Sequence, residues 1–171
     1  KNIPENSVFT IARLTEAKKF ELYNQKVIAF KDIPDDAPLN DNQWMQVESE
    51  LNNTTSIDKK KLKEFVKDLQ YPLYFLDFET FGTAVPVFDK SRPYQQLVFQ
   101  YSLHCLPTAK GKLIHSEFLA EANGSDPRSL FVEKLIADCG TEGDILVYNI
   151  GFERGKLNEL VLQFPKYKTR L

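Results

Sequence analysis

The sequence has no apolar run approaching the roughly 20 residues that a membrane-spanning helix requires. Its first five residues, 1–5, lack the basic, apolar and small-residue regions of a secretory signal peptide. We therefore expect a cytoplasmic protein that works without a membrane partner. The chain starts without Met and stops on a polar, basic run, so we also expect it to be a segment of a longer polypeptide.

Cysteine and histidine are scarce, with two residues of each. Cys105 and Cys139 stand in apolar surroundings without a CxxC motif or a Cys/His cluster, which argues against a disulfide framework or a zinc site. We expect both thiols to be reduced and to lie in the core. His104 and His115 have no acidic partner at a recognisable spacing, so structural roles are favoured for them.

The chain also lacks a large charge of one sign, because its net charge is −2. Residues 1–70 and 71–171 each carry 11 basic and 12 acidic side chains. Bulk charge therefore does not predict a nucleic-acid partner, although a bound metal or a local basic strip can serve the same purpose. A composition of 42% hydrophobic and 27% charged residues is typical of globular protein, and 171 residues suffice for one full domain.

Residues 1–70 are predicted to form a helical accessory or connecting segment. The patterns favour helices over 15–23, from a cap at Asn40 with Gln43 completing a capping box, and from Ser56 onward. The last of these carries an apolar stripe at helical spacing, namely Leu62, Phe65, Val66 and Leu69. Its lysines then lie on the other face, where solvation is a more common role than phosphate binding.

Residues 71–171 are predicted to form an α/β domain with a mixed sheet. The order is strand, strand, strand, helix, strand, helix, over residues 71–80, 97–106, 113–119, 126–140, 145–148 and 151–164. Three consecutive strands favour an antiparallel meander, and the helix before the fourth strand gives a crossover. No internal repeat interrupts this order.

Several finer features of this domain follow from its side-chain patterns. Residues 71–80 are apolar on both faces, which predicts a central strand covered on both sides, and 145–148 predicts a buried parallel strand. Alternation in the second strand places five residues on one face: Leu97, Phe99, Tyr101, Leu103 and Cys105. Asp126 and Pro127 are predicted to open the first helix, and Arg128 in its first turn is expected at the surface.

Two carboxylates end the first strand. Asp77 and Glu79 are two residues apart, so a strand places them on one face, about 6 to 7 Å from each other. Two such acids repel each other unless a cation lies between them, and a hard divalent ion such as Mg²⁺ prefers oxygen ligands. The motif therefore predicts a metal site, and a solvated strand end is the alternative.

Glu153 is a third acidic candidate. It lies in the first turn of the last helix, and positions four and seven residues later are Leu157 and Leu160, so its carboxylate shares the apolar face. An inward acid must be paired or bind metal, whereas an outward one is explained by the helix dipole. If the fourth strand lies beside the first and parallel to it, Glu153 reaches the space over Asp77 and Glu79, where the three acids would hold one or two Mg²⁺ or Mn²⁺ ions.

Smaller candidates follow the first and fourth strands. Arg92 could hold a phosphate and Tyr94 could stack on a base, while the alternative is a polar loop leading into a strand. Asn149 could orient a substrate, although a bond to the loop backbone is slightly favoured.

The motifs at residues 77–80 and 147–153 resemble the first two sequence motifs of the DEDD-type 3′–5′ exonucleases of the ribonuclease-H-like superfamily. Further stretches are similar to an uncharacterised bacterial domain-of-unknown-function family within that superfamily, whose members join this domain to an upstream RecB-like nuclease region. These stretches are Arg92 to Gln96, Phe99 to His104 and Asp126 to Arg128.

The resemblance implies a metal-dependent nuclease acting on single-stranded ends of DNA or RNA through a two-metal site. Asp77, Glu79 and Glu153 would be catalytic and bind metal, and Thr80, Arg92, Tyr94 and Asn149 would contact substrate. The second-motif acid is Asp in most of the superfamily and Glu153 here, and the third motif would lie beyond Leu171. The segment alone is then expected to be inactive.

Two alternatives remain open. The first is a non-catalytic module that keeps the nuclease fold to bind nucleic acid or to brace the neighbouring nuclease region. The second is a RecB-type nuclease core, for which only Glu16-Ala17-Lys18 offers the required triplet, in a helical stretch without a partner acid.

Overall fold

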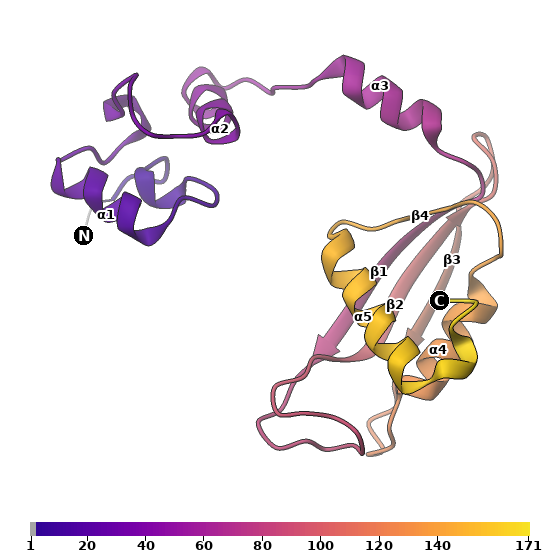
Figure 1. The fold of residues 1–171 in the computed structure, drawn as a ribbon. Helices are drawn as coiled ribbons and strands as arrows, with labels where there is room; N and C mark the ends of the chain where they lie inside the picture. The colour runs from indigo at the N-terminus through magenta and orange to yellow at the C-terminus, as the bar shows by residue number, and fades with distance from the viewer. Residues whose placement is uncertain (1–2) are drawn as a thin grey trace. The chain divides into compact units, whose positions relative to one another are not determined.

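A computed structural model describes residues 3–171. The chain divides into two compact units, one reaching to Glu64 and the other comprising Phe65–Leu171 (Figure 1). Each unit has its own hydrophobic core cluster. Among the described residues, no helix is long and apolar enough to cross a membrane.

The first unit is helical, as predicted. It contains η1 (Val8–Thr10), α1 (Glu16–Asn24), η2 (Phe30–Asp32) and α2 (Asp41–Asn52). The predicted capping box is confirmed, because Asn40 Oδ1 accepts from Gln43 N and Gln43 Oε1 accepts from Asn40 N. The core is built from small and medium apolar side chains: Val8, Ile11, Leu14, Leu22, Phe30, Ile33, Ala37 and Val47.

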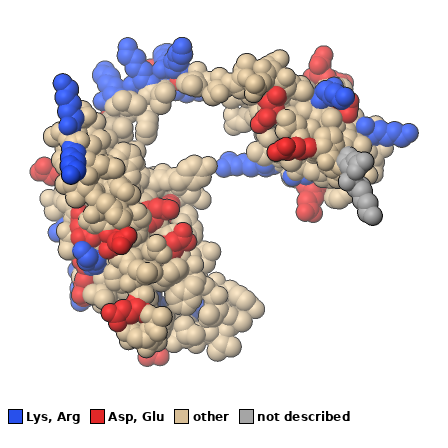
Figure 2. Space-filling view, turned by 180° about the vertical axis from the view of Figure 1, so that it is seen from behind, with Lys and Arg blue, Asp and Glu red and all other residues tan. Residues whose placement is uncertain are grey.

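The helix α3 (Lys59–Asp68) differs from its prediction in two respects. It begins three residues after Ser56, because the Asp58 carboxylate accepts hydrogen bonds from the backbone of Lys60 and Lys61. Its apolar stripe is also uncovered, and Leu62, Phe65 and Val66 are exposed by 52, 55 and 58% respectively. The lysines of this helix gather along it in the space-filling view (Figure 2).

The second unit has the predicted order of elements. It contains β1 (Leu73–Phe81), β2 (Leu97–Leu106), β3 (Ile114–Leu119), α4 (Arg128–Asp138), β4 (Asp144–Leu146), α5 (Ile150–Gln163) and η3 (Pro165–Tyr167). The sheet order is β3-β2-β1-β4, with β1 antiparallel to β2 and parallel to β4. A mixed α/β sheet with the fourth strand beside the first is therefore confirmed.

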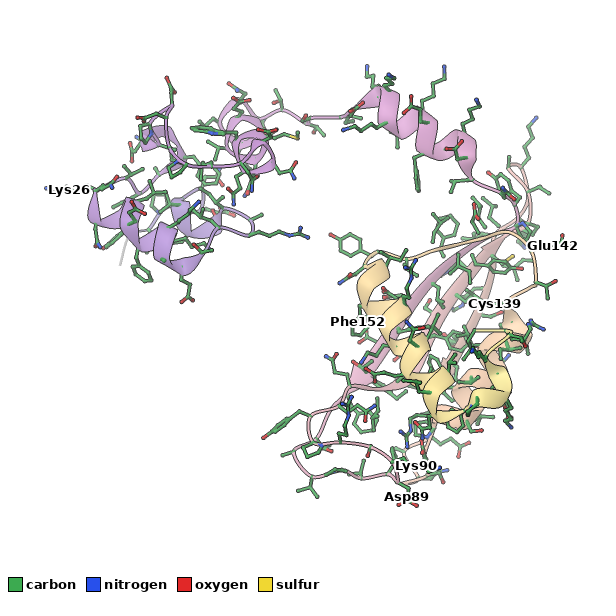
Figure 3. All side chains as sticks on the ribbon, viewed as in Figure 1. Lys26, Asp89, Lys90, Cys139, Glu142 and Phe152 are labelled. Carbon is green, nitrogen blue, oxygen red and sulfur yellow. The ribbon has the colours of Figure 1, made fainter. Side chains whose placement is uncertain are left out.

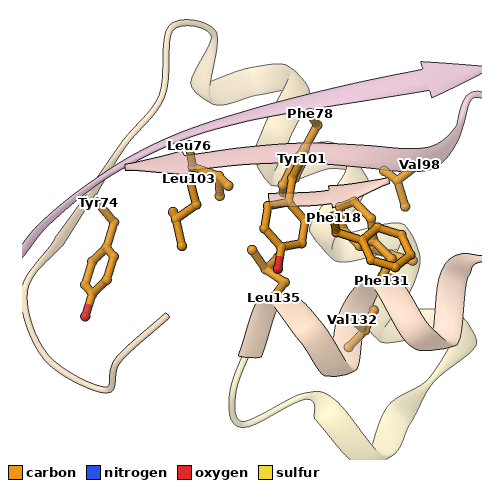
Figure 4. Packing of buried hydrophobic residues seen from close by; sticks show 11 residues of the cluster. Tyr74, Leu76, Phe78, Val98, Tyr101, Leu103, Phe118, Phe131, Val132 and Leu135 are labelled. Atoms are coloured by element: carbon orange, nitrogen blue, oxygen red, sulfur yellow. The ribbon is translucent and has the colours of Figure 1, made fainter. Parts of the chain in front are cut away.

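The helices α4 and α5 lie over one face of this sheet (Figure 1). Phe131 stands edge-on to the rings of Phe78 and Tyr101, at centroid distances of 5.3 Å in each case. Figure 4 shows this packing, which places aromatic rings of β1 and β2 against the inward face of α4. The buried cluster comprises Tyr74, Leu76, Phe78, Val98, Tyr101, Leu103, Phe118, Phe131, Val132, Leu135 and Leu160.

The expectation that residues 71–80 are covered on both faces is wrong. Burial alternates along β1, with Tyr74, Leu76 and Phe78 buried but Phe75 and Asp77 exposed. The outer face of the sheet is thus open in the described part of the chain, and it carries the acids. Figure 2 views the molecule from behind, and acidic side chains gather on the second unit there.

A β-bulge alters the predicted alternation of β2. Glu79 pairs with Gln100 while Thr80 pairs with Val98, so Phe99 is an extra residue without a partner in β1. As a result Val98, instead of Phe99, joins the core cluster, whereas Tyr101 stays inward as predicted.

β4 is parallel to β1 as predicted but is not buried. It is a short edge strand, and Ile145 and Tyr148 are exposed. The Asp144 backbone N donates to Pro72 O, and its carboxylate accepts from Gln70 N. Gly143 has φ +90°, and a side chain there would collide with the Pro72 backbone, so glycine is needed where the two strands meet.

The cysteines are free and half-buried, and both pack against the core cluster of the second unit. Burial, followed by the nearby Asp138 carboxylate, raises the pKa of Cys139 to about 11. A raised pKa leaves little thiolate, the reactive form of cysteine, at neutral pH.

Tyr101 carries a buried hydroxyl group in the core of the second unit. Its ring is fully buried, and its Oη donates to Asp138 Oδ2 at 2.6 Å. Burial and this hydrogen bond raise the pKa of Tyr101. We expect Tyr101→Phe to lower the free energy of unfolding by only about 1 kcal/mol, because Asp138 keeps its ion pair with Lys134. Urea denaturation followed by circular dichroism measures this difference, and a loss above about 3 kcal/mol would contradict it.

Candidate functional site

Asp77 and Glu79 lie side by side on the open face of β1. Their Cα partners in β2 are Ser102 and Gln100. Within residues 3–171, neither carboxylate takes part in a hydrogen bond or an ion pair, although acids this close repel each other. The pair is therefore free to accept a cation.

Glu153 lies in the first turn of α5 and is only 4% exposed. Its Oε2 is buried and has no hydrogen-bond partner among the described residues. The inward direction expected from Leu157 and Leu160 is confirmed, because both contribute to the core cluster. An acid in this position costs folding free energy unless something outside the described contacts binds it.

The structure brings two of the three acids together. Glu153 lies on the helix-covered side of the sheet, whereas Asp77 and Glu79 point to the other side. No group of three His, Cys, Asp or Glu side chains within residues 3–171 is arranged to hold a metal ion. The predicted strand arrangement is thus present, but a joint ligand set would require Glu153 and the β1 acids to approach each other.

A shallow groove runs along the open face beside Asp77. It is lined by Phe75, Leu76, Asp77, Ser102, His104, Leu146, Val147 and Tyr148. The aromatic ring of Phe75 is 42% exposed, and Tyr148 is fully exposed at the end of the strand region that precedes α5. The groove therefore offers apolar and aromatic surface next to a carboxylate.

The loop of residues 82–96 presents Arg92 and Tyr94, both predicted to contact substrate. Asp89 and Lys90, at its tip, are labelled in Figure 3. Tyr94 is 76% exposed and has φ +58°, a conformation that is uncommon for a bulky residue. Its backbone N donates to Thr83 O, which holds this strained position. Arg92 and Tyr94 line one open pocket with Lys156 of α5.

A polar contact ties this loop to α5. Gln95 Nε2 donates to Glu159 Oε2 at 3.0 Å, and Lys156 Nζ lies 3.0 Å from the other carboxylate oxygen. Burial raises the pKa of Glu159, but the hydrogen bonds from Gln95 and Lys156 outweigh it and leave the pKa below its usual value. One acid thus joins the loop to the helix, and the charge of Arg92 also contributes to the lowered pKa of Glu159.

Thr80 and Asn149 are the remaining predicted contact residues. Thr80 is half-buried after the bulge and pairs with Val98. Asn149 precedes α5, and among the described residues its side chain makes no hydrogen bond, so the favoured bond to the loop backbone is absent. Its amide is exposed and open to a ligand.

Arg128 contradicts the expectation of a surface position, because it is only 1% exposed. Its guanidinium contacts both carboxylate oxygens of Asp126, donates to Asp89 O at 2.8 Å and donates to Gln163 Oε1. It also lies 5.9 Å from the centroid of the Phe88 ring. We define these residues as the Arg128 network, which fixes the 82–96 loop to both helices.

Only one contact of the Arg128 network, the one with Asp126, involves residues close together in the sequence. Asp126 was predicted as the cap of α4, but Pro127 occupies the cap position and this helix begins at Arg128. Asp126 still accepts a hydrogen bond from the Arg128 backbone N. The partners Asp89 and Gln163 are 39 and 35 residues away from Arg128, so local patterns do not reveal them.

Comparison with known proteins identifies a family without an assigned activity. A family model described as "Domain of unknown function (DUF2779)" matches residues 74–171. The chain is also 30% identical over 105 residues to an "Uncharacterized protein MG366 homolog" of Mycoplasma pneumoniae. That alignment covers 58% of this chain and 16% of the Mycoplasma protein, so the chain spans about one sixth of its relative's length. No solved structure matches the chain.

Proposed function

The chain belongs to the family described as a domain of unknown function, DUF2779, and we propose that its second unit is a divalent-metal-dependent nuclease domain. The proposed fold is ribonuclease-H-like, and the proposed reaction is hydrolysis of DNA or RNA phosphodiesters of the 3′–5′ exonuclease type. The observation that carries the proposal is the pair Asp77 and Glu79, exposed on one face without a protein partner in residues 3–171.

The donor set fits a hard cation. Asp77 and Glu79 offer carboxylate oxygens, which Mg²⁺ and Mn²⁺ prefer, and the buried Oε2 of Glu153 is a further oxygen without a partner in the described residues. When bound, such an ion supplies Lewis-acid polarisation of a phosphodiester and a water of lowered pKa. Two further features support the assignment to a ribonuclease-H-like nuclease. They are the order of the motifs at residues 77–80 and 147–153 and the parallel pairing of β4 with β1.

The other side chains would bind and orient the nucleic acid. Arg92 would contact a phosphate and Tyr94 would stack on a base; the exposure of Tyr94 and the open pocket that both residues line support these roles. Single-stranded ends fit this surface best, because stacking requires unpaired bases. Further catalytic ligands in the longer protein, and a partner nuclease region in it, are part of the same proposal.

Metal binding by Asp77 and Glu79 is directly testable. We expect Asp77→Asn and Glu79→Gln each to weaken Mn²⁺ binding by about tenfold or more, since loss even of outer ligand contacts has effects of this size. Isothermal titration calorimetry on the 171-residue chain measures it. The matched control is Glu142→Gln, which removes an exposed acid elsewhere in the same unit. Binding that is unchanged in both variants would refute the site.

A non-catalytic module is the second candidate, and one observation favours it. The three acids do not converge within the described residues. A nuclease assay on the full-length protein with a labelled single strand separates the two functions. Cleavage that Asp77→Asn abolishes supports the nuclease, whereas metal binding without cleavage supports a binding or scaffolding role.

A further inference from the structure

Two histidines stand directly opposite each other on the open sheet face. His104 of β2 is the Cα partner of His115 of β3. Their rings stack with centroids 4.5 Å apart and planes inclined by 28°. They are the only two histidines of the 171-residue chain. Both imidazole groups of this chain are therefore gathered at one position, which the spacing of the residues in the sequence did not suggest.

Two polar side chains lie beside this pair. Ser102 Oγ is 3.4 Å from His115 Nε2, and a carboxylate oxygen of Glu117 is 3.9 Å from the same nitrogen. In a Ser–His–acid relay, the hydroxyl and the carboxylate contact opposite ring nitrogens. Here both approach Nε2, so the cluster is not arranged to activate a serine. It presents instead nitrogen and oxygen donors on one open surface.

We propose that His104 and His115 form a binding site for a late first-row divalent cation of the Zn²⁺, Ni²⁺ and Cu²⁺ class. Imidazole nitrogen suits these ions, whereas carboxylate and water oxygens suit Mg²⁺ and Mn²⁺. The Glu117 carboxylate is the nearest additional donor, and water completes the coordination. The site differs in ligand chemistry from the Asp77 and Glu79 pair and does not rest on the proposed nuclease function.

The strand register makes the two nitrogens accessible to one ion. Directly opposed residues of an antiparallel pair have Cβ atoms about 4.5 to 5.5 Å apart, and Zn–N bonds are about 2.0 to 2.1 Å long. The stacked rings must turn from parallel to convergent, since no three ligands in the described residues are gathered as they stand. Room for this turn exists, because the side chains of His115 and Glu117 are 45 and 73% exposed.

Zinc titration of the 171-residue chain tests the site. We expect one Zn²⁺ per chain in calorimetry, and binding weakened about tenfold or more by His115→Ala and by His104→Ala. Glu142→Gln, which removes an exposed acid elsewhere in the same unit, and Cys105→Ser serve as controls that leave Zn²⁺ binding unchanged. In ¹⁵N-histidine NMR spectra, both imidazole signals should shift together and saturate at one equivalent. Unfolding curves without metal verify that His115→Ala folds.

Several outcomes would overturn the proposal. They are the absence of Zn²⁺ binding to the unmodified chain, affinity unaffected by His115→Ala, or loss of Zn²⁺ binding in Asp77→Asn. Zn²⁺ binding by a chain that does not bind Mg²⁺ or Mn²⁺ supports the histidine site while counting against the nuclease proposal. The two proposals therefore fail independently.

Discussion

Replacing Arg128 with methionine should destabilise the second unit by about 3 to 5 kcal/mol, the range found when one partner of a buried ion pair is removed. Methionine fills part of the volume, but it leaves Asp126 without its bidentate partner and removes the donors to Asp89 O and Gln163 Oε1. Because the Asp126 side chain is 34% exposed and can reach water, we expect the lower end of this range.

Urea denaturation with two probes measures the effect within one sample. Circular dichroism reports on both units, whereas the single tryptophan, Trp44, lies in the first unit. The transition of the second unit should shift to lower urea while the Trp44 emission transition stays in place. Arg154→Met is the matched control, because Arg154 is exposed on α5. Equal stability of Arg128→Met and Arg154→Met would show that the Arg128 network does not hold the unit together.

The Arg128 network also predicts that the stability of the second unit depends on pH. Burial raises the pKa of Asp126, but the hydrogen bonds and charge of Arg128 outweigh it, so the folded-state pKa lies below the usual value. A carboxylate whose pKa is lowered by folding contributes its full stabilisation at pH values above its unfolded-state pKa, which is about 4 for aspartate. This stabilisation is lost as the pH falls through the pKa of the folded state. Between pH 6 and pH 3, the urea midpoint of the unmodified protein should therefore fall more than that of Arg128→Met.

The elements were predictable because their signals are local. Alternation, helical spacing and caps such as Asn40 with Gln43 depend on neighbours a few residues apart. The open face was missed because the run Leu73 to Leu76 obscures the alternation that Asp77 and Glu79 continue. Only the contacts of α4 and α5 decide which face of an apolar strand is covered, and these contacts are not local.

In the candidate site too, features that depend on local spacing could be predicted, whereas features that depend on contacts distant in the sequence could not. The side-by-side placement of Asp77 and Glu79 follows from the period of a strand, and the inward direction of Glu153 follows from the period of a helix. The pairing of His104 with His115 depends on the β2–β3 register, which the intervening turn sets. Whether all three acids reach one ion depends on which side of the sheet α5 covers, and no spacing in the sequence encodes this.

Glu153 offers a second large effect, opposite in sign to that of Arg128. We expect Glu153→Met to raise the free energy of unfolding by about 2 kcal/mol, because it removes a buried carboxylate oxygen without a partner in residues 3–171. The substitution loses at most about 1 kcal/mol of interaction with the helix dipole, and methionine and glutamate have similar helix propensities. The gain from removing the buried polar atom therefore exceeds the loss of the helix-dipole interaction, and the net change in the free energy of unfolding is positive.

Glu153→Gln is the matched control, because it keeps the shape and the buried polar atoms and should give little stabilisation. Denaturation of all three proteins should be repeated with saturating Mn²⁺. If Glu153 is retained for a ligand, any Mn²⁺-dependent gain in stability of the unmodified chain should shrink in Glu153→Met, although that variant is more stable without metal. A buried residue that lowers stability in isolation and contributes only with a ligand is typical of a functional site. A less stable Glu153→Met would instead mean that the carboxylate has a structural partner, and Glu153 would then be no candidate for the metal site.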